Sequence, residues 1–240
     1  MASQPRYHRV LLKISGEGLS GPGGAGIDDA ALDRTADEIL AVQRLGVQVA
    51  VVIGGGNFIR GRQFAGHQHI QRTTADTMGM LATTINALAL RDRIESAGVE
   101  APVMGTITRA SVCEAFIRRH AIDHLKKNRV VILAGGTGSP FFTTDTCAAL
   151  RAAEIGADAL LKATQVDGVY DADPRKNPAA RRFTHLTYQE VLARRLGVMD
   201  LTAVSMCMDS GIPVVVFRLD EPGSIVRVVL GEDVGTTITA

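Results

Sequence analysis

The feature that most constrains this chain is the stretch 47–60, VQVAVVIGGGNFIR. Seven mostly apolar, Val-rich residues lead directly into three consecutive glycines, a pattern typical of a short strand buried on both faces of a sheet. Glycines at a strand end let backbone N–H groups approach an object that side chains would keep away, most often a phosphate. A flexible turn between a strand and a helix has the same signature, so this stretch alone leaves both interpretations open.

A second apolar run, 129–134, also ends in glycines, within the stretch GGTGSPFFTTD. A helix is expected from about Thr144 to Gly156, and hydroxyl groups beside the free N–H groups of a helix N-terminus favour an anion. An ordinary capped turn is the alternative, but it does not account for two glycine-rich loops after two buried strands. The second loop supplies four hydroxyl groups and one carboxylate, from Thr137, Ser139, Thr143, Thr144 and Asp145.

Lysine is scarce in this sequence, with only five copies, yet two of them interrupt apolar runs. Lys13 lies in VLLKIS and Lys162 in ADALLKAT. A lysine in an apolar strand is costly unless its ammonium group reaches solvent or a partner. Snorkelling from the strand end is the structural alternative. The glycines that follow Lys13 favour delivery of the charge to the carboxyl edge of the sheet, where α/β proteins bind ligands.

Predicted strands and helices alternate along the chain, with connections of helical length between strands. This alternation predicts an α/β fold, a three-layer α/β/α sandwich with a central, largely parallel sheet, formed by a single domain over residues 1–240. The segment 164–173, which contains an Asp-Gly pair, is expected to form a hairpin or tight loop, and 174–182 a polar loop. We expect strands at 10–14, 47–53, 102–105, 129–134, 157–163, 213–217 and 236–239, and helices at 29–45, 73–97, 113–127, 144–156, 188–196, 199–211 and 223–230.

Several familiar motifs are absent from the sequence. The stretch Gly16–Gly21, GEGLSG, matches the dinucleotide pattern GxGxxG in letters only, because GPGGAGID follows and cannot open the helix that this motif requires. Gly21–Gly26 is therefore a loop, either a surface turn or a mobile regulatory segment. The sequence has no P-loop, no protein-kinase signature and no GxSxG motif. His67 and His69 stand in a polar loop without carboxylates nearby, which favours a solvated loop over a metal site.

The bulk composition excludes two classes of partner. The formal net charge is +1 and aromatic residues make up 4%, so the chain has neither a basic footprint nor a stacking platform for nucleic acid. No stretch is long enough to span a membrane, and the apolar run near the N-terminus is too short for a signal peptide. Cys113, Cys147 and Cys207 lack a CxxC spacing, as expected for buried thiols in a reducing compartment. We therefore expect a cytoplasmic protein.

Together these features match the needs of phosphoryl transfer. That reaction requires backbone donors for phosphate oxygens and cations for developing charge, and it needs little covalent chemistry from the protein. The two glycine loops supply the donors, Lys13 and Lys162 supply the cations, and Arg60 and Asp145 lie beside the loops. Asp145 either orients the lysines or helps to hold a metal, and the residues alone leave both roles open.

Five segments carry a resemblance to a known family: VLLKISGE, VVIGGGNFIRG, TGSPFFTTD, LKATQVDGVYDADP and the closing GT-I-T. They resemble, in the same order and over essentially the whole chain, the bacterial uridylate (UMP) kinases of the amino-acid kinase superfamily. TGSPFFTTD and MGMLAT distinguish that family from the carbamate, acetylglutamate and glutamate kinases. The resemblance implies transfer of the γ-phosphoryl group of ATP to UMP, giving UDP, by a homohexamer that uses Mg²⁺ carried with ATP.

The resemblance also implies roles for individual positions. Lys13, Asp145 and Lys162 would be catalytic, with Lys13 on the transferred phosphoryl group and Asp145 ordering the lysines, and no side chain is implied as a metal ligand. ATP would contact Lys13, Ile14, Ser15, Gly16, Gly56, Arg60, Thr164, Gln165, Tyr170 and Asp173. UMP would contact Gly55, Asp76, Thr137, Gly138, Ser139, Pro140, Phe141, Phe142, Thr143 and Thr144. An allosteric loop linked to GTP would comprise Gly21, Pro22, Gly23, Gly24, Ala25 and Gly26.

The chain departs from many members of that family at three positions. They carry Asn where this chain has Ser139, and Lys or Asn where it has Gln165. Pro102 stands where some GTP-regulated members have arginine, so activation by GTP and inhibition by UTP stay open. Two other functions stay open as well: a regulatory protein of the same fold that binds UMP or GTP without turnover, and a family member that forms an acyl phosphate.

Overall fold

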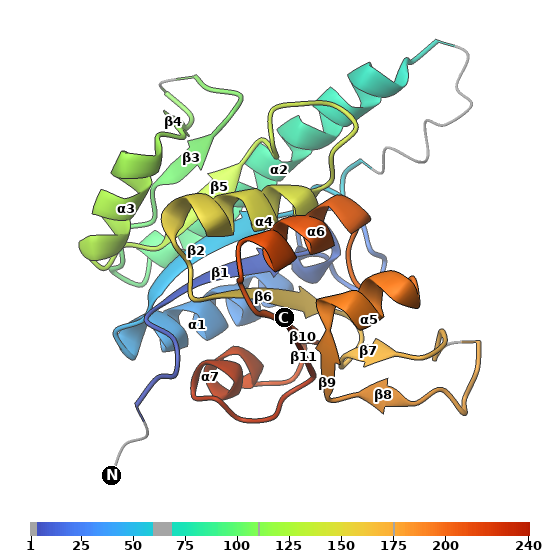
Figure 1. The fold of residues 1–240 in the computed structure, drawn as a ribbon. Helices are drawn as coiled ribbons and strands as arrows, with labels where there is room; N and C mark the ends of the chain where they lie inside the picture. Colours follow the sequence, from blue (N-terminus) through green and yellow to red (C-terminus); the bar gives the residue numbers. More distant parts are fainter. Residues whose placement is uncertain (1–3, 60–68, 110, 175) are drawn as a thin grey trace.

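The computed structural model describes residues 4–59, 69–109, 111–174 and 176–240. Within these residues, a nine-stranded sheet has the order β4-β3-β5-β2-β1-β6-β10-β11-β9 (Figure 1). Its neighbouring strands run parallel in this described part, except for the antiparallel pair β10 and β11. The strands are β1 Arg9–Ile14, β2 Gln48–Ile53, β3 Val103–Gly105, β4 Glu114–Ala115, β5 Val131–Ala134, β6 Ala159–Thr164, β9 His185–Thr187, β10 Val214–Arg218 and β11 Thr236–Thr239. The helices are η1 Gly16–Leu19, α1 Asp29–Arg44, α2 Arg72–Glu95, α3 Arg118–Lys126, α4 Thr144–Ile155, α5 Tyr188–Ala193, α6 Leu201–Asp209 and α7 Ser224–Val229.

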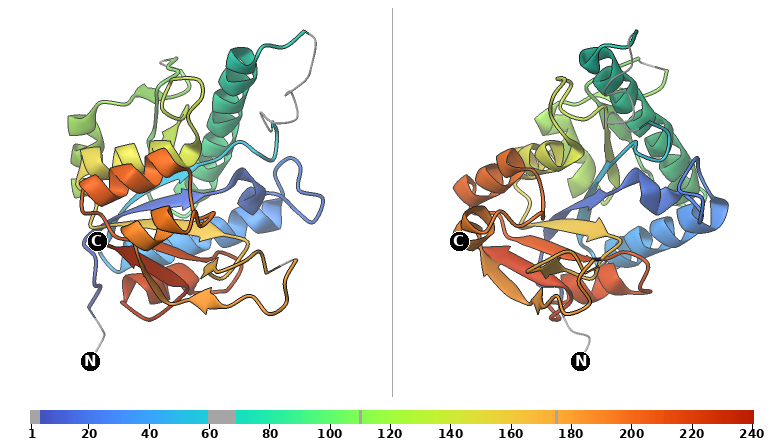
Figure 2. Two further views of the ribbon diagram at one scale, coloured as in Figure 1. Left: turned by 45° about the vertical axis from the view of Figure 1, so that its right-hand side comes forward. Right: turned by 90° about the vertical axis from the view of Figure 1, so that its right-hand side faces the viewer.

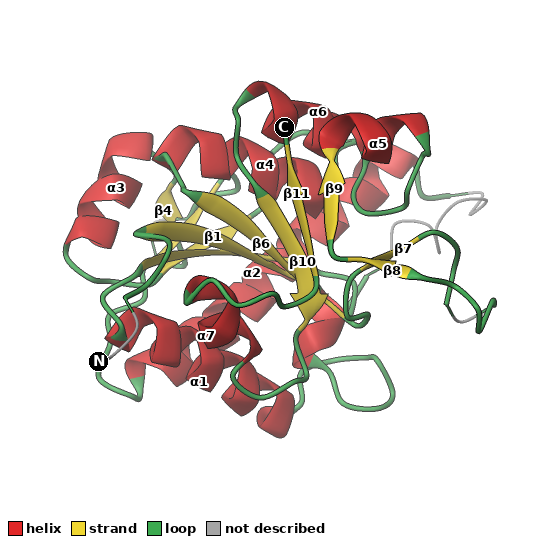
Figure 3. Cartoon of the chain, turned by 60° about the horizontal axis from the view of Figure 1, so that its bottom comes forward, coloured by secondary structure: helices red, strands yellow, loops and turns green. Residues whose placement is uncertain are grey.

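Helices cover both faces of the sheet (Figure 3). On one face, side chains of α1, α2 and α7 join a core that includes Leu12. On the other face, side chains of α3, α4, α5 and α6 join a core that includes Leu11. Successive strand residues point to opposite faces, so alternate positions of β1 feed the two cores. β2 is buried from Val49 to Ile53, and the three-layer α/β/α sandwich predicted from such apolar runs is confirmed.

The strands that carry the candidate site are neighbours. β5, β2, β1 and β6 are consecutive and parallel, so their carboxyl ends lie at one edge of the sheet. The two glycine loops follow β2 and β5, and the two lysines lie in β1 and β6. In the left view of Figure 2, the loop after β1, the N-terminal end of α2 and the hairpin of β7 (Val169–Tyr170) and β8 (Arg182–Phe183) project on the same side. The topology therefore gathers at one edge residues that are far apart in the sequence.

One helix begins later than the sequence predicts. A helix is expected over 113–127, but α3 spans only Arg118–Lys126. The N–H of Cys113 donates to the carbonyl of Arg109 in a turn, and the next two residues form β4 beside β3. Cys113 is buried against the core. Pairing at the sheet edge satisfies backbone groups that a helix would otherwise satisfy, and this moves the helix start towards the C-terminus.

The hairpin near residue 170 is wider than predicted. β7, Val169–Tyr170, pairs antiparallel with β8, Arg182–Phe183, so the polar segment between them is the hairpin loop. The Asp-Gly pair at 167–168 precedes β7 and does not form the turn. The N–H of Val169 donates to Thr236 Oγ1 at 2.8 Å, which fixes β7 against β11. The sequence also missed β9, His185–Thr187, which pairs with β11.

Candidate active site

At the centre of the carboxyl edge, one carboxylate binds two ammonium groups. Lys13 and Lys162 are register partners on the neighbouring strands β1 and β6, so their side chains leave the sheet on the same face. Asp145 lies in the first turn of α4, and its N–H donates to the N-cap hydroxyl of Thr143 at 3.0 Å. Lys13 Nζ lies 2.9 Å from Asp145 Oδ1, and Lys162 Nζ donates to Asp145 Oδ2 at 2.7 Å. The fold thus brings together three residues that are distant in the sequence.

Burial and charge act in opposite directions on this cluster. Burial would raise the pKa of Asp145, but the ammonium groups of Lys13 and Lys162 outweigh it and hold that pKa below its ordinary value. Burial lowers the pKa of Lys162, and the Lys13 ammonium adds to this effect, while Asp145 opposes it. Two ammonium groups against one carboxylate leave a net positive charge in a largely buried place, which suits the binding of an anion.

A cleft of about 690 Å³ opens at the two lysines. Among the residues expected to contact ATP, it is lined by Lys13, Ser15, Thr164, Gln165, Tyr170 and Asp173. Ile14 does not face this cleft, because its side chain is fully buried in the core. Arg60 lies outside the described residues. Tyr170 is held in place by its hydroxyl group, which donates to Asp167 Oδ1 at 2.6 Å.

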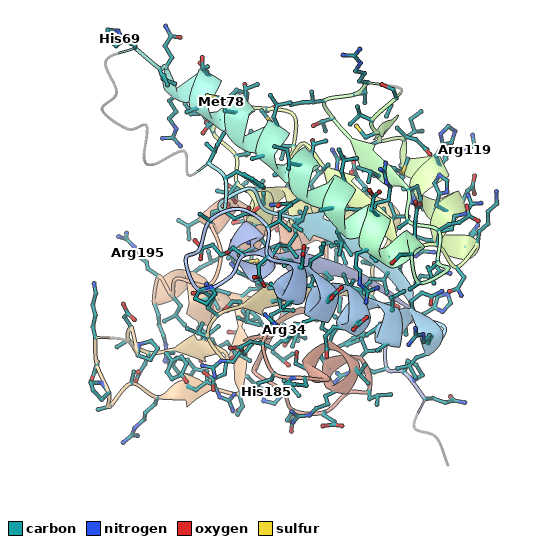
Figure 4. All side chains as sticks on the ribbon, turned by 180° about the vertical axis from the view of Figure 1, so that it is seen from behind. Arg34, His69, Met78, Arg119, His185 and Arg195 are labelled. Carbon is teal, nitrogen blue, oxygen red and sulfur yellow. The ribbon has the colours of Figure 1, made fainter. Side chains whose placement is uncertain are left out.

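One wall of this cleft was not predicted, the turn Arg194–Val198 between α5 and α6. The sequence predicts helix as far as 196, but Arg195 adopts a left-handed φ of 50° after α5 has ended. Figure 4 shows the Arg195 side chain extending away from the ribbon. The Val198 carbonyl accepts a hydrogen bond from Lys162 Nζ, so this turn fixes one of the two lysines. The local sequence, RRLG, signals a helix end and does not indicate a ligand.

A smaller cavity of about 160 Å³ lies between α2 and the start of α4. Among the residues expected to contact UMP, it is lined by Gly55, Asp76, Thr137, Ser139, Phe142, Thr143 and Thr144. Gly138, Pro140 and Phe141 belong to the same loop but do not line the cavity. Sequence reasoning missed other lining residues, namely Ile59, Ala75, Gly79, Met80, Thr83 and Gly136. Met80 lies on α2, the helix expected over 73–97.

The loop over the smaller cavity is tied to α2 through its backbone. The N–H of Phe141 donates to Asp76 Oδ2 at 2.9 Å, and the Arg72 guanidinium lies 5.2 Å from the centre of the Phe141 ring. Phe141 adopts a left-handed φ of 74°, which is unusual for a side chain of this size. The Phe141 side chain itself is 62% exposed. Asp76 therefore shapes the cavity as well as lining it.

The three glycines after β2 serve different purposes. A Cβ on Gly55 would lie 2.7 Å from the Gly79 carbonyl and 2.8 Å from Ala82 Cβ, so Gly55 is required by close packing on α2. Gly54 packs against the backbone of Gly16, and its N–H donates to Ile14 O at 2.9 Å. Among the described residues, no heavy atom would lie within 4 Å of a Cβ on Gly56. At Gly54 and Gly55, close packing therefore requires that the side chain be absent.

A buried amide pair joins this glycine turn to the loop Gly21–Gly26. Asn86 Nδ2 donates to Gly54 O at 2.8 Å, and Asn57 and Asn86 exchange hydrogen bonds of 2.7 and 3.0 Å between their side chains. Asn57 Nδ2 also donates to the Gly26 carbonyl at 2.7 Å, and the Gly26 N–H donates to the Asn57 carbonyl. The loop expected to be regulatory is thus anchored at its end to the turn beside the site.

The described ranges contain neither a cluster of metal ligands nor a membrane-spanning helix. No group of three His, Cys, Asp or Glu residues in the described part of the chain could hold a metal ion. His69 is exposed near the projecting N-terminal end of α2 (Figure 4), and His67 lies outside the described residues. No helix among residues 4–59, 69–109, 111–174 and 176–240 is long and apolar enough to cross a membrane.

Comparison with known proteins matches this arrangement to one family. The model of the amino acid kinase family matches residues 8–218, which include the glycine loops, both lysines and Asp145. The chain belongs to the amino acid kinase family. This family member is 56% identical, over 99% of both chains, to a uridylate kinase of Paramagnetospirillum magneticum.

Solved structures resemble this amino acid kinase family member along its whole length. The crystal structure of a UMP kinase from Bacillus anthracis has a TM-score of 0.94 at 42% identity and covers 97% of this chain and 96% of its own. A UMP kinase from Ureaplasma parvum has a TM-score of 0.91 at 35% identity, with 98% and 100% covered. A uridylate kinase from Archaeoglobus fulgidus has a TM-score of 0.74 at 32% identity, with 96% and 99% covered.

Proposed function

We propose that this protein is a UMP kinase, which transfers the γ-phosphoryl group of ATP to UMP and yields ADP and UDP. The observation that carries the proposal is the position of the lysine–aspartate cluster between two cavities. The larger cleft ends at Lys13 and Lys162, and the smaller cavity is bounded by Thr143 and Thr144, next to Asp145. Similarity to uridylate kinases over the whole chain supports this acceptor.

The larger cleft is proposed as the ATP site and the smaller cavity as the UMP site. Lys13 and Lys162 then neutralise the charge that spreads over the transferred phosphoryl oxygens as the bond to ADP breaks. The acceptor is a phosphate oxygen of UMP, and a phosphate monoester is largely ionised at neutral pH. No general base is therefore required, and Asp145 acts by holding both ammonium groups in position.

Specificity for UMP is proposed to reside in the smaller cavity. Asp76, Thr137 and Ser139 line this cavity. In the proposal, the Asp76 carboxylate accepts a hydrogen bond from the ribose or base of UMP. The Phe141–Asp76 hydrogen bond sets the position of this wall. Ser139 replaces the asparagine of many family members, so its shorter side chain leaves room for water between the loop and the ligand.

We propose Mg²⁺ as the divalent ion, carried to the site with ATP. Mg²⁺ prefers oxygen ligands and is commonly held by nucleotide phosphates with one or two carboxylates. Asp145 is already engaged by two ammonium groups, so the phosphate oxygens are the natural ligands here. The ion when bound would neutralise charge on the β- and γ-phosphates, and the two lysines would face the same oxygens.

A homohexamer, activation by GTP and inhibition by UTP are also proposed from the family resemblance. Two apolar side chains on α2, Leu81 and Ile85, are 47% and 48% exposed, and an assembly that uses this helix would bury them. The loop Gly21–Gly26 is the proposed regulatory segment.

A cytoplasmic location is supported by three free, buried cysteines.

An acceptor panel tests the proposed function. Purified protein is assayed for ADP release from MgATP with UMP, CMP, carbamate, acetylglutamate or glutamate, each with and without GTP. We expect turnover with UMP far above that with the other acceptors. Turnover with an acyl acceptor in place of UMP would favour an acyl-phosphate-forming enzyme. Binding of UMP or GTP without any ADP release would favour a regulatory protein of the same fold.

A further inference from the structure

Asp200 connects the beginnings of two helices. It is the N-cap residue of α6, and its Oδ1 accepts from the N–H of Ala203 at 3.0 Å. The same carboxylate accepts from two hydroxyl groups at the start of α4. Thr146 Oγ1 lies 2.9 Å from both oxygens of Asp200, and Thr143 Oγ1 donates to Oδ2. One carboxylate therefore joins α4 to α6 across more than fifty residues of sequence.

The contact with Asp200 determines the orientation of the Thr143 hydroxyl group. An ionised carboxylate only accepts hydrogen bonds, so the Thr143 proton must point towards Asp200. The lone pairs of Thr143 Oγ1 are then directed at α4, where they accept from the N–H groups of Asp145 and Thr146 at 3.0 and 3.3 Å. All of the hydrogen-bonding capacity of this hydroxyl is used. Thr143 therefore caps the helix that carries Asp145 and has no proton left to donate to a ligand.

The segment that ends at Asp200 also contacts the lysines. Two residues before it, the Val198 carbonyl accepts from Lys162 Nζ. The Lys162 ammonium donates to Asp145 on α4 and to the Val198 carbonyl, and it also experiences the charges of Lys13 on β1 and of the Asp200 carboxylate. Asp200 supports the charged form of Lys162 from a distance, because its carboxylate raises the pKa of that ammonium group against the effect of burial.

We propose that Asp200 is a positioning residue of the phosphoryl-transfer site. It acts through Thr143 and Thr146, which fix the first turn of α4 so that Asp145 holds Lys13 and Lys162 in place. It also holds the Thr143 edge of the proposed UMP cavity, so the acceptor wall and the cation pair share one anchor. The inference rests on the proposed UMP kinase activity, and it assigns a role to a residue that makes no contact with either nucleotide in this scheme.

Asp200→Asn tests the proposal with little change of shape. The amide retains one oxygen for the Ala203 cap, but its nitrogen is a donor that faces the hydroxyl groups of Thr143 and Thr146. Thr143 would have to accept from this nitrogen, and it would lose a lone pair that now serves α4. We expect kcat to fall by about 10- to 100-fold, the size of loss that a misplaced catalytic group causes. We expect KM for MgATP to change less than about threefold, and the alkaline limb of kcat to move to lower pH.

Asp28→Asn is the matched control, because Asp28 is also an aspartate at a helix N-cap. Its Oδ1 accepts from the Ala31 N–H at 2.9 Å at the start of α1, away from the lysines. If Asp200 serves only to cap a helix, both variants lose the same stability and neither loses kcat. A second test uses Asp145→Asn as background. Because Asp200 acts mainly through Asp145, its replacement should lower kcat much less in this background than in the wild type, and an equal loss in both backgrounds would overturn the positioning role.

Different results would contradict the positioning role of Asp200 and the UMP kinase activity. A wild-type protein without UMP-dependent ADP release overturns the UMP kinase assignment. An active wild type with a folded Asp200→Asn variant of unchanged kcat and pH profile overturns only the positioning role. If Asp200→Asn does not fold, Thr146→Val takes its place, since it removes one hydroxyl contact and leaves the Asp200 charge. A loss of kcat in this variant supports the proposal, and an unchanged kcat overturns it.

Discussion

Lys13 and Lys162 are register partners on adjacent parallel strands, and each binds a different oxygen of Asp145. The pairing of β1 with β6 brings two ammonium groups together, and α4 supplies the single carboxylate that offsets their repulsion. The cluster is left with a net positive charge. An anion that enters the site therefore neutralises this excess positive charge, as a γ-phosphate does during transfer.

Replacing Lys13 by alanine should abolish most of the activity without abolishing acceptor binding. The ammonium group of Lys13 lines the proposed ATP cleft but not the smaller cavity. We expect kcat to fall by at least about 100-fold and the Kd for UMP, measured by titration calorimetry, to change little. Lys126→Ala, on an exposed position of α3, is the control and should match the wild type. Full activity in the Lys13→Ala variant would contradict the role given to this residue.

The fall of kcat at alkaline pH should reflect the loss of the proton from Lys162. Its pKa lies below the ordinary lysine value of 10.5, so the ammonium group loses its proton at a lower pH in the folded protein. We expect kcat to fall as pH rises through that lowered pKa. At pH values between this lowered pKa and 10.5, Lys162 binds more protons in the unfolded chain than in the folded protein. The contribution of Lys162 to stability therefore increases with pH in this window, while activity declines. A Lys162→Arg variant stays charged and should not show this fall, which a pH series of kcat for both proteins would reveal.

Asp145→Asn should destabilise the fold at neutral pH. It leaves two largely buried ammonium groups without their carboxylate, at a cost of about 3–5 kcal/mol in the free energy of unfolding. Because the folded-state pKa of Asp145 is lowered from 3.8, its contribution is complete above that value and is lost as pH falls through the folded pKa. Urea unfolding of both proteins from neutral pH to about pH 3 should show their difference shrink at the acid end. A constant difference would argue against the ionised state of Asp145.

Gly55→Ala and Gly56→Ala form a matched pair at neighbouring positions. An alanine at 55 would press on the α2 backbone near Gly79, and we expect a loss of about 1–3 kcal/mol in stability together with weaker UMP binding. The Cβ of an alanine at 56 meets no heavy atom of the described residues within 4 Å, so stability should stay within about 0.5 kcal/mol. Thermal unfolding and UMP titration distinguish the two. Equal losses of stability would contradict the packing role of Gly55.

Local sequence patterns were sufficient for the main layers, but not for the contacts within the central cluster. The α4 helix, for example, was predicted at 144–156 and is observed at Thr144–Ile155, because its start and end depend on a neighbouring cap and on Gly156. The turn Arg194–Val198 and the role of Asp200 were not predicted. Asp200 meets its hydroxyl partner on Thr146 across 54 positions, and no local pattern encodes such a contact.

The sequence by itself determined that two buried strands end in glycines, that two others carry lysines and that an aspartate begins the next helix. These are properties of short stretches, and hydrophobic burial and helix capping act on neighbours in the chain. Only the tertiary structure decided that Gly55 packs on α2 while Gly56 does not, that Asp76 holds the Phe141 backbone, and that Lys13 and Lys162 share Asp145. Strand register and helix packing decide such contacts, because they depend on segments that meet only when the whole chain is folded.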